Sequence, residues 1–157
     1  MGPQKKNGFS LIELLLVVAV ILIIAAIAIP SLMRARMSAN EASAVGSLRT
    51  INTAIANYAS SYGLGYPATL AALGPSASPS STAADLLDSV LAAGVKSGYS
   101  FNYSAEMPVG GIISKYAITA DPVNVGVSGQ RGFYTDQILV IHVNATGSAT
   151  AADPPLK

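Results

Sequence analysis

Gly8-Phe9-Ser10-Leu11-Ile12-Glu13 begins the stretch that decides the fold, and the letters LLLVVAVILIIAAIAIP complete it through Pro30. No charged residue lies between Glu13 and Arg34. As a helix rising about 1.5 Å per residue, the run from Phe9 to Ile29 would be roughly 30 Å long, the thickness of a bilayer's hydrocarbon core. A single segment can satisfy its own backbone hydrogen bonds in lipid only as a helix. The sequence therefore predicts a membrane-competent helix.

Glu13 is the unusual residue of this stretch. It lies about one helical turn inside the N-terminal end of the apolar run. A carboxylate inside a membrane span costs about 2.5–3.5 kcal/mol near the centre, so such a residue is a candidate for function. Glu13 is therefore the first functional residue that the sequence predicts.

Three interpretations of the N-terminus follow from the residues alone. In the first, Lys5 and Lys6 precede a secretory signal peptide that is cut near Ala26-Ile27-Ala28, although the apolar run is longer than usual and Glu13 interrupts it. In the second, the helix is a plain anchor whose two lysines hold the N-terminus in the cytoplasm. In the third, a short basic leader is removed after Gly8 and leaves the helix as a packing element. Physical chemistry alone leaves these alternatives open.

The residues around Gly8 carry a family resemblance. Lys5-Lys6-Asn7-Gly8, followed by residues 9–14 (FSLIEL), resembles the class III leader junction of type IV pilins and type II secretion pseudopilins. Pro30, after the unbroken apolar run, matches the helix-kinking proline of that family. The strong match covers residues 5 to about 36 and combines four features that few unrelated sequences share. The resemblance favours the third interpretation.

The resemblance implies a processing and assembly route. A prepilin peptidase would cut between Gly8 and Phe9 and methylate the new amine of Phe9. The precursor would be a single-span inner-membrane protein with a cytoplasmic N-terminus, and an assembly machine would extract it from the bilayer into a helical homopolymer at the cell surface. Glu13 would pair with the Phe9 amine of a neighbouring copy, and Pro30 would loosen the helix during packing.

The remaining chain predicts an α+β, pilin-like fold. We divide it into a leader (1–8), a transmembrane and filament-core helix (9–30), an amphipathic half of the same helix (31–63) and a globular head (64–157). Apolar residues recur at helical spacing in the third segment: Met33, Met37, Val45, Leu48, Ile51, Ile55, Tyr58 and Tyr62. Charged residues of this segment are expected on its solvated surface: Arg34, Arg36, Glu41 and Arg49.

The head is expected to hold short helices and about four antiparallel strands. One helical turn would end at Gly74, and a second, capped or led by Asp85, would end at Gly94. Alternating or apolar runs predict strands at 99–103, 113–119, 133–135 and 138–143, with a tight turn at Asp136-Gln137 between the last two. From Asn144 onward the composition predicts an irregular tail.

Composition and motifs favour a structural protein over an enzyme. His142 is the only histidine, no serine lies in a G-x-S-x-G elbow, and there is no cysteine. Many pilins close a C-terminal loop with a disulfide, so this chain departs from that pattern. Three aspartates, Asp121, Asp136 and Asp153, could ligate calcium as in major pseudopilins, but no Asp-Gly-rich loop accompanies them. We expect no metal and no cofactor.

The charge balance is nearly neutral. Removing residues 1–8 leaves seven basic and eight acidic side chains, a net charge of −1. A chain with this balance has no strong electrostatic footprint for nucleic acid. The predicted function is therefore that of a type IV pilus-like filament subunit. The alternatives are a type II secretion pseudopilin and, from another class, a single-span anchored periplasmic binding module.

Overall fold

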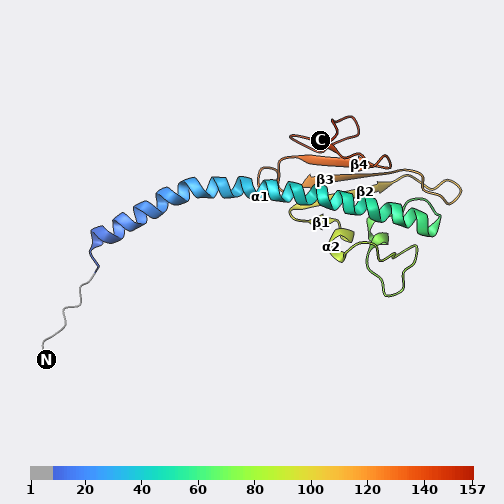
Figure 1. Ribbon diagram of the computed structural model, residues 1–157, viewed down its shortest axis with the longest axis horizontal. Helices are drawn as coiled ribbons and strands as arrows, with labels where there is room; N and C mark the ends of the chain where they lie inside the picture. Colours follow the sequence, from blue (N-terminus) through green and yellow to red (C-terminus); the bar gives the residue numbers. More distant parts are fainter. Residues whose placement is uncertain (1–8) are drawn as a thin grey trace, which may run out of the picture. The chain divides into compact units, whose positions relative to one another are not determined.

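The computed structural model describes residues 9–157 (Figure 1). The leader, including the expected cleavage residue Gly8, lies outside the described residues. The chain divides into two compact units, Met1–Ala35 and Arg36–Lys157. One helix, α1 (Leu11–Tyr62), contributes to both.

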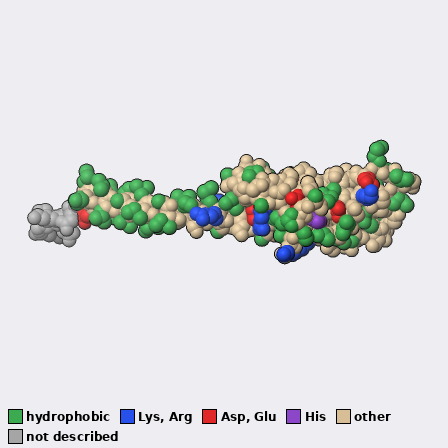
Figure 2. Space-filling model, turned by 90° about the horizontal axis from the view of Figure 1, so that it is seen from above, with side chains coloured by type: hydrophobic (Ala, Val, Ile, Leu, Met, Phe, Trp, Pro, Cys, Tyr) green, Lys and Arg blue, Asp and Glu red, His purple; other side chains and the backbone are tan. Residues whose placement is uncertain are grey.

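The described part of the first unit is the apolar half of α1. Its most apolar 18-residue window has a mean hydropathy of 3.2, and no residue in that window is buried. Hydrophobic side chains cover the face of this segment visible in Figure 2. A helix that is apolar on all sides is suited to a membrane span or to a core formed with other helices. The helix continues through Pro30 without ending there, as the sequence predicts.

In the second unit, the rest of α1 packs against a five-stranded antiparallel sheet in the order β1-β2-β3-β4-β5. The strands are β1 (Val95–Lys96), β2 (Tyr99–Ala105), β3 (Tyr116–Pro122), β4 (Gly132–Asp136) and β5 (His142–Asn144). The predicted α+β, pilin-like architecture is confirmed. Because consecutive strands are neighbours, the sheet is a simple meander whose turns alternate between its two ends.

The core lies between the sheet and one stripe of α1. Leu48, Ile51, Ile55 and Tyr58 are buried, as the helical spacing predicts, and they pack in one cluster with Tyr99, Phe101, Ile118 and Phe133 of the sheet. Val45 and Tyr62 are half-buried against this cluster. Met33, which the spacing places on the same stripe, is exposed in the first unit. The buried part of the stripe begins only at Glu41.

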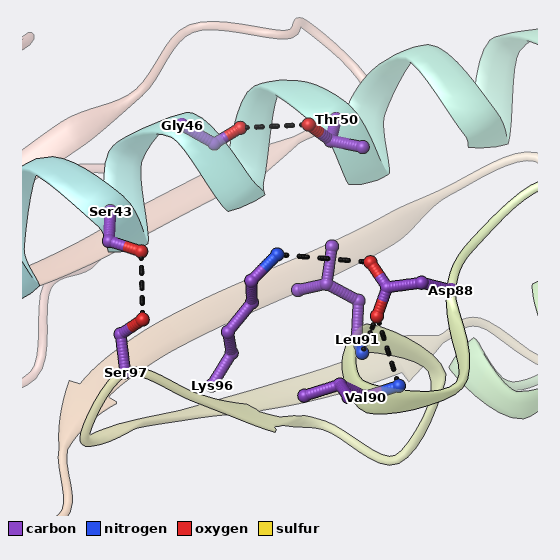
Figure 3. Close-up of polar contacts among 8 residues, drawn as sticks. All are labelled: Ser43, Gly46, Thr50, Asp88, Val90, Leu91, Lys96 and Ser97. Carbon is purple, nitrogen blue, oxygen red and sulfur yellow. Dashed lines mark hydrogen bonds and ion pairs between the residues drawn. The ribbon is translucent and has the colours of Figure 1, made fainter.

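Two short helices precede the sheet. The first, η1 (Leu70–Leu73), is a 3₁₀ turn capped by Thr69 and followed by Gly74, close to the expected end. The second, α2 (Ser89–Ala92), is capped by Asp88, whose carboxylate accepts hydrogen bonds from the N–H groups of Val90 and Leu91 (Figure 3). The prediction of a cap at Asp85 is wrong. Asp85 instead adopts a left-handed conformation with φ of 55°.

Polar contacts tie the β1–β2 region to its neighbours. The Asp88 carboxylate lies 3.8 Å from the Lys96 ammonium, and the Ser43 hydroxyl of α1 donates to the Ser97 hydroxyl (Figure 3). The Asp88–Lys96 pair is not buried, since both side chains are more than one-third exposed. Such an ion pair contributes little to stability. The cap itself is the stronger feature, and its hydrogen bonds hold the pKa of Asp88 below its usual range.

The last predicted hairpin differs from the observed one. The run from Ile138 to Ile141 is expected to be a strand, but it forms a loop between β4 and β5. Asp136 fixes this loop, because its carboxylate accepts from the Ile138 N–H and its carbonyl from the Leu139 N–H, both at 2.9 Å. Leu139 takes a left-handed φ of 64°, which is rare for leucine. The apolar run therefore turns instead of extending the sheet.

The C-terminal residues cover the outer edge of β5. The Val143 N–H donates to the Pro154 carbonyl, and the Leu156 N–H donates to the Ile141 carbonyl. An unpaired sheet edge is a template for unwanted pairing with other chains. The tail that the sequence predicts to be irregular thus has a structural role at this edge.

A buried polar group sets how α1 lies on the sheet. Asn52 donates to the Thr135 hydroxyl at 3.0 Å and accepts from the Tyr116 hydroxyl at 3.2 Å. All three side chains are buried. Because Asn52 belongs to α1 and its two partners belong to β4 and β3, these hydrogen bonds form in only one position of the helix.

We expect Asn52→Ala to lower the free energy of unfolding by about 1–3 kcal/mol, because two buried hydroxyl groups lose their partner. Asn57→Ala, on the exposed side of α1, is the control and should change stability little. Thermal unfolding of the full chain in detergent, followed by circular dichroism, measures both. Equal midpoints for the two variants would contradict the prediction.

Candidate functional site

The first site is the beginning of α1. Ser10 directly precedes the helix, and its carbonyl accepts hydrogen bonds from the Glu13 and Leu14 N–H groups at 3.1 and 3.2 Å. In return, the Glu13 carboxylate accepts from the Ser10 backbone N–H at 3.0 Å. This reciprocal contact is half of a capping box, in which a glutamate three residues into the helix holds the residue before it. Glu13 therefore has a local role that the sequence analysis missed, although the Ser10-x-x-Glu13 spacing signals it.

Apolar side chains surround Glu13. A shallow hollow at this end of α1 is lined by Glu13 together with Phe9, Ile12, Leu16 and Val17. The carboxylate is the only charged side chain among residues 9–33. An anion is favoured near a helix N-terminus, where unpaired N–H groups give a partial positive charge. The helix end can thus hold this carboxylate in an otherwise apolar surface.

Of the residues that the sequence singles out, the structure brings Phe9 and Glu13 together and places Pro30 apart from them. Phe9 and Glu13 line the same hollow. Pro30 lies 17 residues beyond Glu13 in α1, about 25 Å along the helix axis. Gly8 falls outside the described residues. The candidate site is therefore the Phe9–Glu13 turn, and Pro30 lies elsewhere on the same helix.

Comparison with known proteins bears on this turn. A family model described as a prokaryotic N-terminal methylation motif matches residues 3–29. The chain carries the class III prepilin leader. The resemblance to type IV pilins and pseudopilins at the N-terminus is thereby confirmed. The matched residues cover the leader and the apolar helix but not the head. No curated protein and no solved structure matches the chain.

A second polar site, on the head, is not predicted by the sequence. Glu41 is expected on the solvated surface, but it is buried between α1 and the loop before β4. One carboxylate oxygen accepts from the N–H groups of Gln130 and Arg131 at 2.9 and 3.1 Å, and the other accepts from the Arg131 guanidinium at 2.7 Å. We call this arrangement, with the Tyr99 hydroxyl that donates to the Arg131 carbonyl, the Glu41 clamp.

Opposing effects set the ionisation of the Glu41 clamp. Burial alone would raise the pKa of Glu41, but the hydrogen bonds from Gln130 and Arg131 and the charge of Arg131 outweigh it and hold the pKa below its ordinary value. Burial, reinforced by the Glu41 charge, raises the pKa of the Tyr99 hydroxyl to about 12. At neutral pH, Glu41 is therefore ionised and Tyr99 is neutral, which is the state in which each makes its hydrogen bonds.

The three aspartates considered for calcium are not grouped together in the structure. Within residues 9–157, no group of three or more histidine, cysteine, aspartate or glutamate side chains is placed to hold a metal ion. Asp136 fixes the β4–β5 loop, and Asp121 lies in β3. Asp153 accepts from the Thr150 N–H and hydroxyl and from the Asn144 amide. The three aspartates thus belong to three different elements: β3, the end of β4 and the C-terminal tail.

Asp153 closes the C-terminal loop without a disulfide. Besides its carboxylate contacts, its carbonyl lies 2.6 Å from the His142 ring nitrogen Nδ1. The hydrogen bonds from Thr150 hold the pKa of Asp153 below its usual range. His142 is therefore part of a structural contact between β5 and the tail.

The Glu41 clamp predicts a specific pH dependence. The pKa of Glu41 is lower in the folded chain than its ordinary value of 4.5, so ionised Glu41 stabilises the fold above about pH 4.5. This contribution is lost as the pH falls through the folded-state pKa. Glu41→Gln should reduce the free energy of unfolding by about 1–3 kcal/mol at pH 7, because Arg131 loses its charged partner. The difference in free energy of unfolding between Glu41→Gln and the wild type should become smaller in acid.

Denaturant unfolding of both full chains in detergent, at pH values from about 7 down to about 3, measures this dependence. The matched control is Glu106→Gln, which removes an exposed partner of Lys115 and should cost well under about 1 kcal/mol. If the Glu41→Gln deficit were as large in acid as at neutral pH, the ionised clamp would not be its cause.

Proposed function

We propose that the chain is the precursor of a structural subunit of a type IV pilus-like filament. The observation that carries the proposal is the single carboxylate of Glu13 at the start of an exposed and otherwise uncharged segment of α1, within a matched N-terminal methylation motif. A helix that only anchors a protein in the membrane needs the apolar length but not the Glu13 carboxylate. The proposed role is packing and assembly, not catalysis.

Processing is the first proposed step. Prepilin peptidase hydrolyses the peptide bond between Gly8 and Phe9, and the freed amine of Phe9 receives a methyl group. Lys5 and Lys6 leave with the leader, so the only charges near the new N-terminus are the Phe9 amine and the Glu13 carboxylate. Before cleavage the two lysines favour a cytoplasmic N-terminus. After cleavage the apolar helix still holds the subunit in the inner membrane.

Assembly is the second proposed step. Inner-membrane assembly machinery extracts the helix from lipid, and its apolar surface is buried against the helices of other copies. An unpaired carboxylate in that environment would be strongly destabilising. Glu13 makes only one side-chain hydrogen bond among the described residues, to the Ser10 N–H, which leaves acceptor capacity for the Phe9 amine of a neighbouring copy. Pairing these charges would fix the register of adjacent helices.

Pro30 contributes local freedom. Proline has no N–H, so the carbonyl four residues earlier, that of Ala26, lacks its usual helical donor. The helix therefore has a weak point between its apolar half and its amphipathic half. We propose that the subunit adjusts there when it packs into the filament.

The first test is the N-terminus of the protein recovered from cells. Intact-mass measurement and N-terminal sequencing should find a chain that begins at N-methylated Phe9. Retention of Met1 would favour an anchored periplasmic binding module, and a chain beginning at Ile29 would make the helix a signal peptide. Either result would contradict the proposal. Electron microscopy for long surface fibres then separates a pilus from a type II secretion pseudopilus.

The second test concerns Glu13. Glu13→Ala and Glu13→Leu should insert into the membrane and be cleaved, because neither change shortens the apolar segment. Filament yield should fall by about tenfold or more, since about 1.4 kcal/mol of lost helix pairing is already tenfold in an equilibrium constant. Glu106→Ala, which removes one exposed carboxylate from the head, is the charge-matched control and should assemble normally. Normal filaments from both Glu13 variants would rule out its assembly role.

A further inference from the structure

One face of the sheet is turned away from α1. Ile118 of β3 and Thr135 of β4 are buried on the face that packs against the helix. Because successive side chains point to opposite faces of a strand, Ala117 and Asp136 lie on the other face. Ser104 of β2 joins them there, since Ala117 is the register partner of both Ser104 and Asp136. These three residues form one row across β2, β3 and β4, which are neighbours in the sheet (Figure 1).

A small side chain in the middle of this row leaves a hollow. Ala117 carries only a methyl group, whereas the side chains around it are longer or polar. The hollow is open to solvent and has a volume of about 270 Å³. We call it the Ala117 hollow. Besides Ala117, its lining includes six polar side chains: Ser104, Glu106, Lys115, Tyr134, Asp136 and Gln137.

Asp136 is the most informative polar group of the Ala117 hollow. It is only 8% exposed, although it lines the hollow. Its Oδ1 atom accepts from the Ile138 N–H at 2.9 Å. Among the described residues, Oδ2 contacts only the Tyr134 hydroxyl at 3.4 Å, which is long for a hydrogen bond between two oxygens. A carboxylate has about four acceptor positions, so Asp136 keeps acceptor capacity within the hollow.

Other polar groups of the hollow are also unused or only partly used. The half-buried Gln137 amide makes no side-chain hydrogen bond among the described residues. The Lys115 ammonium lies 3.2 Å from the Glu106 carboxylate, and both side chains are more than half exposed. Burial, reinforced by the negative charge of Asp136, raises the pKa of the Tyr134 hydroxyl, which therefore stays protonated at neutral pH. The hollow thus offers donors and acceptors together.

This mixture of groups narrows the class of ligand. The Asp136 and Glu106 carboxylates disfavour an anion, and the Lys115 ammonium disfavours a simple cation. An apolar molecule would exclude water from the carboxylate and the amide and leave them without partners. A neutral ring with several hydroxyl groups avoids these costs, because each hydroxyl can donate to a carboxylate and accept from an amide or an ammonium.

We propose that the Ala117 hollow binds one neutral sugar ring at the end of a glycan. Asp136 accepts from hydroxyl groups of the ring, Gln137 exchanges hydrogen bonds with them, and Tyr134 supplies an aromatic surface beside the ring. The hollow is slightly smaller than the roughly 300–1,000 Å³ of typical ligand sites, so it suits one ring. Its open side leaves room for the rest of the glycan.

Binding should be weak. Several lining side chains are exposed, and every hydrogen bond to the sugar replaces one to water, so the net gain from each bond is small. We expect a dissociation constant on the order of 1 mM. The inference goes beyond the proposed function and does not depend on it, because it concerns a single head and not the contacts between copies.

Saturation-transfer NMR on the purified full chain tests the site. The chain is held in a phosphocholine detergent, which carries no sugar. The probes are the methyl glycosides of glucose, galactose, mannose and N-acetylglucosamine, since a methyl glycoside mimics the last ring of a glycan. At least one should give a saturable signal with a dissociation constant on the order of 1 mM. In an isotope-labelled chain, the same titration should shift the Gln137 side-chain amide resonance.

Two leucine substitutions separate this hollow from the rest of the sheet face. Ala117→Leu fills the hollow and leaves its polar groups in place, so binding should weaken by about tenfold or more. Ser100→Leu is the matched control, because Ser100 is a half-buried residue on the same face of β2 but outside the lining. It should bind as the wild type does. Circular dichroism checks that both variants fold.

Asp136→Asn tests the proposed acceptor. Asparagine keeps one side-chain oxygen but replaces the other with a donor, so binding should weaken by about fivefold or more. Because Asp136 also fixes the β4–β5 loop, this variant is compared with the wild type only if its circular dichroism spectrum is unchanged. Ala117→Leu remains the deciding variant, since it leaves that loop intact.

Three results would overturn the inference. The first is the absence of a saturable signal from every glycoside up to about 10 mM, ten times the expected constant. The second is equal binding by the wild type and Ala117→Leu, because the sugar would then lie elsewhere. The third is saturable binding of putrescine, a cationic probe, without binding of any glycoside. None of these results bears on filament assembly, which the recovered N-terminus and the Glu13 variants test separately.

Discussion

The constraint on which the structure depends is the uncovered apolar surface of α1. In the half before Ala35, large hydrophobic side chains are exposed on every side of the helix. Burial of apolar surface is worth about 25 cal/mol per Å², so a helix of this kind is stable only in lipid or against similar helices. Both environments exclude charge, which makes the position of the one carboxylate informative. Glu13 lies where helix N–H groups can hold it, at the end closest to the leader junction.

The second half of α1 has a different constraint, because it packs against the sheet of the head. Beyond Arg36, α1 must present one stripe to a sheet whose strands come from the far end of the sequence. Hydrophobic contacts alone allow a helix to slide or rotate, whereas buried polar pairs are satisfied in only one register. Glu41 and Asn52 supply such pairs, about three turns apart, with Arg131 and Thr135. The clamp at Glu41 also fixes the loop before β4, because its carboxylate accepts from the N–H groups of Gln130 and Arg131.

The features that depend on local pattern could be predicted from the sequence. The apolar run follows from composition, the stripe from Leu48 to Tyr58 from helical periodicity, and the leader junction from the resemblance to a known family. The failures have physical reasons. Glu41 occupies the same helical stripe as Leu48, but its charge suggests exposure, and its partner Arg131 is 90 residues away in the chain. The run Ile138–Ile141 has strand composition, yet the turn at Asp136 overrides it. The capping role of Glu13 can be predicted from the Ser10-x-x-Glu13 spacing. The cost of a carboxylate in lipid instead favours the prediction of a role in assembly.

Carboxylates recur at the structural joints of the head, in a chain that has no cysteine. A disulfide would fix a loop covalently; here Asp88 caps α2, Asp136 fixes the β4–β5 loop and Asp153 ties the tail to β5. Each carboxylate accepts at least one backbone N–H, and such charge-assisted bonds are stronger than neutral ones. At Asp88 and Asp153 these bonds hold the pKa of the carboxyl group below its usual range, so they are weakened in acid. A head closed by a disulfide would depend on redox conditions for part of its stability. In this head, the corresponding contacts depend on pH.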